Sequence, residues 1–276
     1  MPPTARERLE VWGDPIEHSQ SPRLHSAAYA ALGLAWAYGR RRVGGEAFAA
    51  ELAGLDASFR GLSLTHPLKR HAFQAAATRD RAAELTGAAN TLLLDAAGPH
   101  GFNTDIGGLV RDLRAHGVGQ LADARIVGAG ATAASALVAL AELGAQRVEV
   151  VARRPDAAEH LRELGARLGL AVHAAPVPSE GELPLTVATL PGGASVSHPL
   201  ADALAASGGL LYDVVYGHWP TSLASAWERT GGQAVDGRGM LVQQALLQVR
   251  VFLHGDAEHE LSDENRVLAA MRSALA

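Results

Sequence analysis

Apolar residues along the chain fall into short runs separated by longer stretches with helical spacing. The runs at 9–13, 35–41 and 59–64 are rich in aliphatic and aromatic residues and predict strands. The stretches at 46–55 and 67–74 predict helices, because their larger apolar residues recur with helical periodicity. A regular alternation of strands and helices is typical of an α/β fold, which we therefore expect here.

The same alternation continues in the second half of the chain. Strands are predicted at 125–127, 148–151, 185–188 and 210–216, with helical segments between most of them. The glycine-containing segment 116–120 separates the two halves and predicts a linker. The sequence therefore favours two α/β domains rather than one.

Composition narrows the class of protein. Hydrophobic residues make up 48% of the 276 positions and charged residues 19%, as in folded globular proteins. The net charge of −5 gives no electrostatic reason to expect a nucleic-acid partner. The chain has no cysteine and its twelve histidines are scattered, so we expect neither a disulfide nor a metal site. No apolar run is long enough to span a bilayer, and we expect a cytoplasmic protein with no membrane partner.

Among the 24 basic residues there is a single lysine, Lys69. A lysine amine can release its proton when its surroundings lower its pKa, whereas arginine stays charged in proteins. Lys69 is predicted to lie in the first turn of the helix at 67–74, just after the strand at 59–64. Open α/β sheets bind their ligands at this end of a strand. Lys69 is therefore a candidate for proton transfer, and an accidental surface lysine is the alternative.

Polar residues stand at the predicted starts of two other helices. Ser21 precedes Pro22 and predicts a helix N-cap, while Ser19 and Ser21 together could instead hold a carboxylate. Asn103 or Thr104 could cap the helix that follows, where Asp105 would favour the N-terminus. The residues alone leave both interpretations of Ser19 and Ser21 open, whereas at 103–105 they favour the cap.

The segment 128–133 reads Gly-Ala-Gly-Ala-Thr-Ala and follows a predicted strand. Glycines at this spacing between a strand and a helix permit a tight turn and a close approach of a pyrophosphate to the helix N-terminus. The next strand, at 148–151, ends in Arg153 and Arg154 where an NAD-binding unit usually has an acidic residue. Two guanidinium groups suit a 2′-phosphate and indicate NADP, and exposed surface arginines are the alternative.

Together these segments resemble the shikimate dehydrogenase family from the first strand to the last helices. The matching segments carry the family's carboxylate motif, its N-x-T-x-P-x-K segment, its two N-T motifs, its glycine-rich turn with the following arginine, and its D-x-x-Y and M-L-x-x-Q segments. The carboxylate motif is at residues 18–22 and the N-x-T-x-P-x-K segment at 63–69. The two N-T motifs are at 90–91 and 103–105. The glycine-rich turn is at 128–133, with Arg153 as the following arginine, and the D-x-x-Y and M-L-x-x-Q segments are at 213–216 and 240–244.

This resemblance implies an oxidoreductase that reversibly reduces 3-dehydroshikimate to shikimate with NADPH, in chorismate and aromatic amino-acid biosynthesis. It implies Lys69 and Asp105 as the catalytic residues. The implied substrate-binding residues are Ser19, Ser21, Ser63, Thr65, Asn90, Tyr216 and Gln244. The implied cofactor-binding residues are Gly128, Ala129, Gly130, Ala131, Thr132, Ala152, Arg153, Arg154, Thr189, Val214, Gly237 and Met240.

Four segments depart from the family pattern. Ser63 stands where many members have Asn, and Ala152-Arg153-Arg154 replaces the common N-R-T. Leu190 replaces a frequent serine, and Pro220 is shifted relative to the tyrosine before it. These departures leave open a quinate or aminoshikimate dehydrogenase that uses NAD or NADP. A catalytically idle homologue that senses metabolites and a generic NADP-dependent two-domain dehydrogenase are further alternatives.

For the architecture we expect two α/β domains. Residues 1–105, completed by C-terminal helices in 240–276, should form a substrate-binding and catalytic domain with a mixed sheet. Residues 106–239 should form a Rossmann-like dinucleotide-binding domain, with the substrate in the cleft between the two. The sequence leaves the oligomeric state open, and a homodimer is one expectation.

Overall fold

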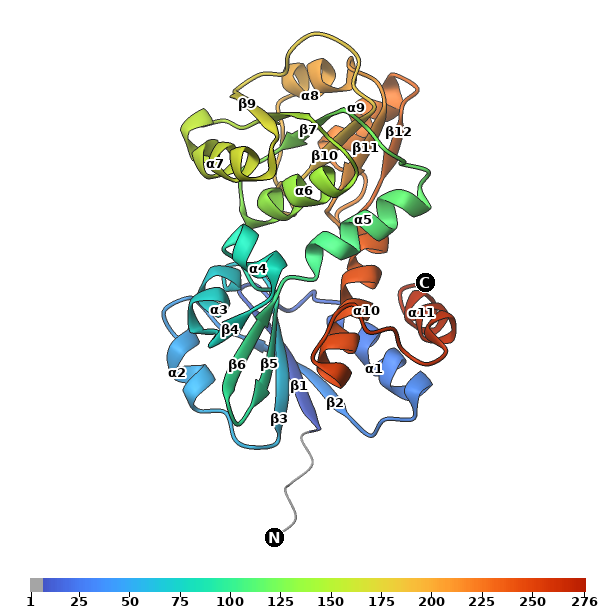
Figure 1. Cartoon of the computed structure of the whole chain (residues 1–276). Helices are drawn as coiled ribbons and strands as arrows, with labels where there is room; N and C mark the ends of the chain where they lie inside the picture. The colour runs from blue at the N-terminus through green and yellow to red at the C-terminus, as the bar shows by residue number, and fades with distance from the viewer. Residues whose placement is uncertain (1–6) are drawn as a thin grey trace. The chain divides into compact units, whose positions relative to one another are not determined.

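The structure, a computed structural model, describes residues 7–276, and the chain divides into two compact units (Figure 1). Unit 1 consists of Met1–Gly108 and Val242–Ala276, and unit 2 of Leu109–Leu241. The chain passes from unit 1 to unit 2 within helix α5 (Asp105–Ala115) and returns within helix α10 (Arg238–His254). The prediction that residues 116–120 link the two domains is wrong, because these residues lie within unit 2 and join α5 to its first strand.

Unit 1 is built on a six-stranded sheet with the order β2-β1-β3-β5-β6-β4. Its strands are β1 (Arg8–Gly13), β2 (Ala37–Arg42), β3 (Phe59–Leu64), β4 (Thr78–Arg79), β5 (Thr91–Asp95) and β6 (Gly98–Phe102). Strand β1 pairs in parallel with β2 and β3, whereas β5 is antiparallel to both β3 and β6. The predicted mixed sheet of the N-terminal part is confirmed.

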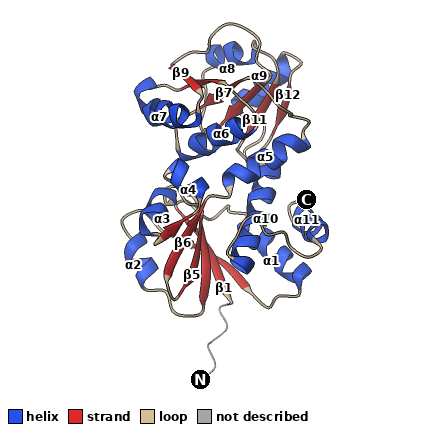
Figure 2. Ribbon diagram, in the orientation of Figure 1, coloured by secondary structure: helices blue, strands red, loops and turns tan. Residues whose placement is uncertain are grey.

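Helices cover both faces of this sheet (Figure 2). Besides parts of α5 and α10 they are α1 (Ser21–Leu32), α2 (Phe48–Ala53), α3 (Lys69–Ala75), α4 (Arg81–Thr86) and α11 (Glu264–Ser273). A core of fully buried side chains joins the sheet to α2 and α3, including Trp12, Leu62, Leu68 and Leu92. This packing holds the start of α3 against the carboxyl end of β3.

Local features of unit 1 differ from the predictions, among them the start of α1 and strand β6. Helix α1 is capped by Gln20, whose side chain makes no capping bond, so the prediction of Ser21 as N-cap is wrong by one residue. Strand β6 was not predicted, since glycine and proline rarely mark a strand. It forms because β5 and β6 are joined by a tight turn and pair in antiparallel register from Thr91–Phe102 to Asp95–Gly98.

Unit 2 contains a six-stranded, fully parallel sheet with the order β12-β11-β10-β7-β8-β9. The strands are β7 (Asp123–Val127), β8 (Arg147–Val151), β9 (Ala171–Ala175), β10 (Leu185–Ala188), β11 (Leu210–Asp213) and β12 (Gln233–Val235). In chain order within the unit this is the strand order of the doubly wound dinucleotide-binding fold. The Rossmann-like prediction for this part of the chain is therefore confirmed.

The crossover segments of unit 2 are the helices α6 (Ala131–Glu142), α7 (Glu159–Leu168), α8 (His198–Ala205) and α9 (Ser222–Arg229), with a short 3-10 helix at Pro155–Ala158. Helix α6 is buried along most of its length, which explains its almost wholly apolar sequence. Within residues 7–276, no helix combines the length and the apolar character that crossing a membrane requires.

Candidate active site

The single lysine is held at the carboxyl end of β3. Lys69 is the first residue of α3, and its carbonyl accepts a hydrogen bond from the backbone of Ala89, just before β5. Its ammonium donates to Oδ2 of Asp105 at 2.5 Å. The Lys69 side chain is only 16% exposed and that of Asp105 7%, so the pair is largely shielded from water. The attraction between the two charges is therefore screened less by water and salt than in an exposed pair.

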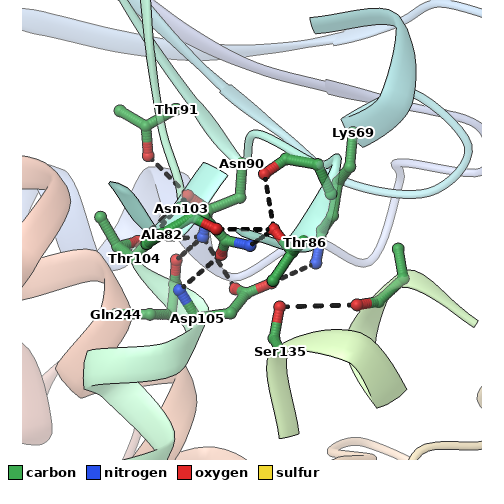
Figure 3. Close-up of polar contacts among 12 residues, drawn as sticks. Lys69, Ala82, Thr86, Asn90, Thr91, Asn103, Thr104, Asp105, Ser135 and Gln244 are labelled. Carbon is green, nitrogen blue, oxygen red and sulfur yellow. Dashed lines mark hydrogen bonds and ion pairs between the residues drawn. The ribbon is translucent and has the colours of Figure 1, made fainter. Parts of the chain in front are cut away.

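Asn90 stands at the centre of the polar cluster around this pair (Figure 3). Its Nδ2 group lies 2.7 Å from Oδ1 of Asp105 and 3.4 Å from Oε1 of Gln244. Its Oδ1 atom accepts from the backbone N–H of Thr104 at 3.0 Å and from the Thr91 hydroxyl at 2.8 Å. The Asn90 amide therefore presents its donor side, not its carbonyl, to the Asp105 carboxylate.

Gln244 reaches this cluster because α5 and α10 approach closely. The ideal Cβ position at Gly108 is only 2.7 Å from Cβ of Gln244 and 2.8 Å from its backbone nitrogen, so only glycine fits there. The structure thus brings together four residues that the sequence predicted at separate places, Lys69, Asn90, Asp105 and Gln244.

The remaining predicted substrate-binding residues of unit 1 lie at the same ends of β1 and β3. Ser19 and Ser21 lie at the N-terminus of α1, where Oγ of Ser19 accepts the backbone N–H of Ser21 at 3.4 Å. Thr65 directly follows β3, and its backbone N–H donates to the carbonyl of Trp12 in β1. Their hydroxyls remain predicted substrate ligands.

The Ser63 hydroxyl is engaged within the protein both as an acceptor and as a donor. Ser63 is 3% exposed, accepts from the Tyr38 hydroxyl at 2.6 Å and donates to Oε1 of Gln248 at 2.8 Å. Its role as a substrate ligand stays a prediction, and its hydroxyl proton already has an acceptor.

The predicted cofactor residues of unit 2 gather at the carboxyl edge of its parallel sheet. Gly128 follows β7 with a φ of +117°, and an ideal Cβ there would lie 2.6 Å from the Thr189 hydroxyl oxygen. The Thr189 backbone N–H donates in turn to the carbonyl of Val127. Val214, Gly237 and Met240 follow β11 and β12 at this same edge, and the N–H of Met240 donates to the Tyr212 hydroxyl at 3.2 Å.

The turn has room for a phosphate group. Gly130 is the N-cap of α6, and nothing lies within 4 Å of its ideal Cβ position. Ala129, Ala131 and Thr132 complete the turn and open the helix, whose free N–H groups favour an anion. The local geometry fits a pyrophosphate.

Arg153 and Arg154 follow β8 beside this turn. Both side chains are exposed, and across residues 7–276 neither guanidinium makes a hydrogen bond or ion pair. Many of the chain's other arginines pair with carboxylates, for example Arg147 with Asp123 at 2.6 Å. Two unpaired guanidinium groups at this strand end suit a 2′-phosphate, as predicted for NADP. Ala152 before them is buried and donates from its backbone to Ala175.

Tyr216 lies in unit 2, shortly after the end of β11, and is half-buried. Burial raises the pKa of its phenol above the ordinary value, so it is a hydrogen-bonding group and not a titrating one at neutral pH.

Asp213, the last residue of β11, accepts from the Thr221 hydroxyl that caps α9 and from the backbone of Val215. We assign Asp213 a structural role in shaping the loop that carries the shifted Pro220.

Sequence reasoning missed three buried polar residues next to the site, His25, Tyr38 and Gln248. Gln248 follows Gln244 by one helical turn on α10, and His25 follows Ser21 by one turn on α1. That spacing places each on the face of a helix that also carries a predicted ligand, and could have drawn attention to them. Among the described residues, no group of three histidine, aspartate or glutamate side chains is arranged to hold a metal ion.

Comparison with known proteins adds independent findings. Residues 11–92 match the family model of the shikimate dehydrogenase substrate binding domain. The shikimate dehydrogenase (NADP(+)) of Alkalilimnicola ehrlichii is 39% identical over 245 residues, which span 87% of this chain and 90% of that protein.

Two solved structures are similar over nearly the whole chain. The shikimate dehydrogenase of Mycobacterium tuberculosis has a TM-score of 0.82 and 36% identity, with 97% of this chain and 99% of the other covered. The shikimate 5-dehydrogenase of Thermus thermophilus, solved in complex with NADP(H) and shikimate, has a TM-score of 0.79 and 30% identity, with 97% and 99% covered.

Proposed function

The chain belongs to the shikimate dehydrogenase family, and we propose that it reversibly reduces 3-dehydroshikimate to shikimate with NADPH. This reaction would serve the synthesis of chorismate and the aromatic amino acids. The observation that carries the proposal is the shielded Lys69–Asp105 pair, with Asn90 and Gln244 beside it. Two relatives named shikimate dehydrogenase (NADP(+)), and a similar structure solved in complex with NADP(H) and shikimate, support it.

In this proposal unit 1 binds the substrate. The Ser19 and Ser21 hydroxyls at the N-terminus of α1 hold its carboxylate, since hydroxyls and helix N–H groups both donate to an anion. Thr65, Asn90 and Gln244 hold the ring hydroxyls, and Tyr216 of unit 2 serves as a further substrate-binding residue.

Lys69 manages the proton. As an ammonium it stabilises the negative charge that develops on the carbonyl oxygen during reduction and donates its proton to that oxygen. In the direction of shikimate oxidation the free amine accepts the hydroxyl proton. Asp105 holds the Lys69 amine in place and accepts a hydrogen bond from a substrate hydroxyl, so we treat the two residues as one coupled acid–base unit.

Unit 2 binds the cofactor. When bound, NADP supplies the hydride donor or acceptor of the reaction. The turn from Gly128 to Thr132 receives the pyrophosphate, and Arg153 and Arg154 receive the 2′-phosphate. The unpaired state of both arginines within the described chain favours NADP over NAD.

An absorbance assay at the nicotinamide band tests this function, with shikimate and quinate each combined with NADP and NAD. We expect the highest kcat/KM for shikimate with NADP. Faster turnover of quinate, or of either substrate with NAD, would support the alternative dehydrogenases instead. Tight binding of shikimate without any turnover would support a metabolite-sensing homologue.

We also propose a cytoplasmic location and a homodimer, and sedimentation tests the homodimer separately from the activity. A homodimer would sediment at about twice the 28.7 kDa of the chain, and the kinetic assay should be run at the concentrations used for sedimentation.

A further inference from the structure

We propose that Gln248 is a positioning residue for the Lys69–Asp105 pair and acts on it through Thr91 and Asn90. This inference rests on the proposed function, because Asn90 and the pair are the site of that reaction. Every contact that carries it lies within unit 1.

Gln248 lies on α10, is 2% exposed and bonds through both ends of its amide. Its Nε2 group donates to the backbone carbonyl of Asn90 at 3.1 Å and to the Thr91 hydroxyl at 3.0 Å. The Thr91 hydroxyl donates to Oδ1 of Asn90 at 2.8 Å. Gln248 therefore holds Asn90 at its backbone directly and at its side chain through Thr91.

Asn90 passes this constraint to the reacting groups. Its Nδ2 group donates to Oδ1 of Asp105 at 2.7 Å, and the other oxygen of Asp105 accepts from Lys69 at 2.5 Å. The chain of bonds from Gln248 to the Lys69 amine is continuous, with Thr91, Asn90, Asp105 and Lys69 shown in Figure 3.

The other end of the Gln248 amide is anchored in the core. Its Oε1 atom accepts from the Ser63 hydroxyl at 2.8 Å and lies 3.2 Å from Nε2 of His25. Because an amide oxygen only accepts, His25 carries its proton on Nε2, and its Nδ1 accepts from the Tyr29 hydroxyl at 3.1 Å. The Tyr38 hydroxyl donates to Ser63, and the Tyr38 ring stacks on His25 with centroids 4.0 Å apart.

These partners allow one orientation of Gln248. A flipped amide would point Oε1 at the backbone carbonyl of Asn90, and the two acceptor oxygens would repel. The Asn90 Oδ1 atom also accepts from the backbone N–H of Thr104 at 3.0 Å and from the Thr104 hydroxyl at 3.2 Å, so loss of Gln248 should loosen the Asn90 side chain without turning it over. A moderate loss of activity follows, not its abolition.

The test combines kinetics with side-chain NMR. Gln248→Met keeps the length of the side chain and removes its hydrogen bonds, and Thr91→Val keeps the shape of Thr91 and removes its hydroxyl. We expect each to lower kcat/KM for shikimate about tenfold, as for the loss of one hydrogen bond, and to leave the KM for NADP unchanged. In an Asn90→Ala background each change should lower kcat/KM by less than about twofold. Both changes act through Asn90, so their effects on kcat/KM are not additive with the loss of Asn90.

Val249→Ala serves as the matched control. Val249 is the fully buried neighbour of Gln248 on α10, and its truncation weakens the packing without touching these bonds. It should lower the melting temperature and leave kcat/KM within about twofold of the wild type. If its kcat/KM falls as far as that of Gln248→Met, general loosening of α10 explains the effect and the proposal is overturned.

The NMR measurement follows the side-chain amide pair of Asn90, identified by its disappearance in Asn90→Ala. We expect this pair to shift in both Gln248→Met and Thr91→Val. An unmoved pair, or equal losses of kcat/KM with and without Asn90, would overturn the positioning role. If Gln248→Met does not fold, Thr91→Val decides the question. If the wild type does not oxidise shikimate with NADP, the proposed function fails, while the NMR result still tests the connection from Gln248 to Asn90.

Discussion

The amine of Lys69 and the carboxylate of Asp105 are 2.5 Å apart, and the second carboxylate oxygen is held by Asn90 at 2.7 Å. Both oxygens of Asp105 therefore have a donor before any substrate binds. Such an arrangement fixes the Lys69 amine in direction as well as in distance, which is what a proton transfer needs.

Asp105→Asn tests this relationship. Lys69 and Asn90 donate to different oxygens of Asp105, and asparagine replaces one of these oxygens with an NH2 group, so one of the two donors loses its acceptor. We expect kcat for shikimate oxidation to fall about 100-fold or more, the range for loss of a properly held acid–base group. Circular dichroism should show an unchanged fold. Activity within about twofold of the wild type would show that the pair does not depend on the carboxylate.

Arg153→Ala tests the basis of the cofactor preference. Loss of a charged hydrogen bond to the 2′-phosphate should raise the KM for NADP about 10- to 100-fold and leave the KM for NAD nearly unchanged. Arg147→Ala is the control, because Arg147 is exposed at the opposite end of the same strand and pairs with Asp123. A similar rise for both cofactors, or for both variants, would contradict a specific role of Arg153.

His25 should make the fold sensitive to mild acid. Burial lowers its pKa to about 3 from the ordinary 6.5, while the bond to Gln248 opposes this shift. The folded protein keeps His25 neutral where the unfolded chain already binds a proton. The free energy of unfolding should therefore fall as the pH drops below about 6.5, by at most about 1.4 kcal/mol per pH unit, until the pH nears 3.

Urea unfolding at pH 7.5, 6 and 5 measures this dependence. This pH range lies above the ordinary pKa values of carboxylates. Burial raises the pKa of Asp80, so its contribution to the free energy of unfolding changes with pH in the opposite direction to that of His25. His25→Gln removes the titrating group and should flatten the curve between pH 6.5 and 5. Equal slopes for the wild type and His25→Gln would show that His25 is not buried as a neutral imidazole.

Arg125 and Glu149 offer a test of stability in unit 2. They face each other in register on β7 and β8, and Arg125 is fully buried, with further bonds to Ser207 and Ser179. Glu149→Gln leaves a buried guanidinium without its counter-charge and should lower the free energy of unfolding by about 3 kcal/mol.

Asp123→Asn provides the matched comparison for that change. Asp123 and Arg147 pair in register on the same two strands, but the Arg147 side chain is 65% exposed and that of Asp123 32%. Exposed pairs contribute at most about 1 kcal/mol, so this variant should unfold nearly as the wild type does. Chemical denaturation of both variants gives the comparison, and equal losses would contradict the distinction between a buried and an exposed pair.

Much of the fold follows from local patterns in the sequence. The strands of unit 2 are apolar runs at regular intervals, and the glycines at 128 and 130 stand between a strand and a helix, so both the order of elements and the turn could be predicted. Strand β6 could not, because its stability comes from pairing with β5 and not from its own residues, Gly98 to Phe102.

The candidate site shows the same limit. Lys69, Asn90 and Asp105 could be identified from motifs, but the bonds among them depend on how β3, β5 and α5 pack. The contact between Ser63 and Gln248 was harder still to predict from the sequence. In the sequence Ser63 is only a departure from a family pattern, and its engagement with Gln248 joins residues 185 positions apart. Such a contact becomes visible only when α10 is placed on the sheet.

In the proposed function, Lys69 moves the proton during NADP-linked oxidation of shikimate. The most direct measurement is the initial rate of NADPH formation by the wild type and by Lys69→Met, at saturating shikimate and NADP. We predict that the wild type turns over and that kcat of Lys69→Met is lower by about 100- to 10,000-fold, with KM values little changed and the fold intact. A Lys69→Met enzyme with nearly wild-type kcat would contradict the account.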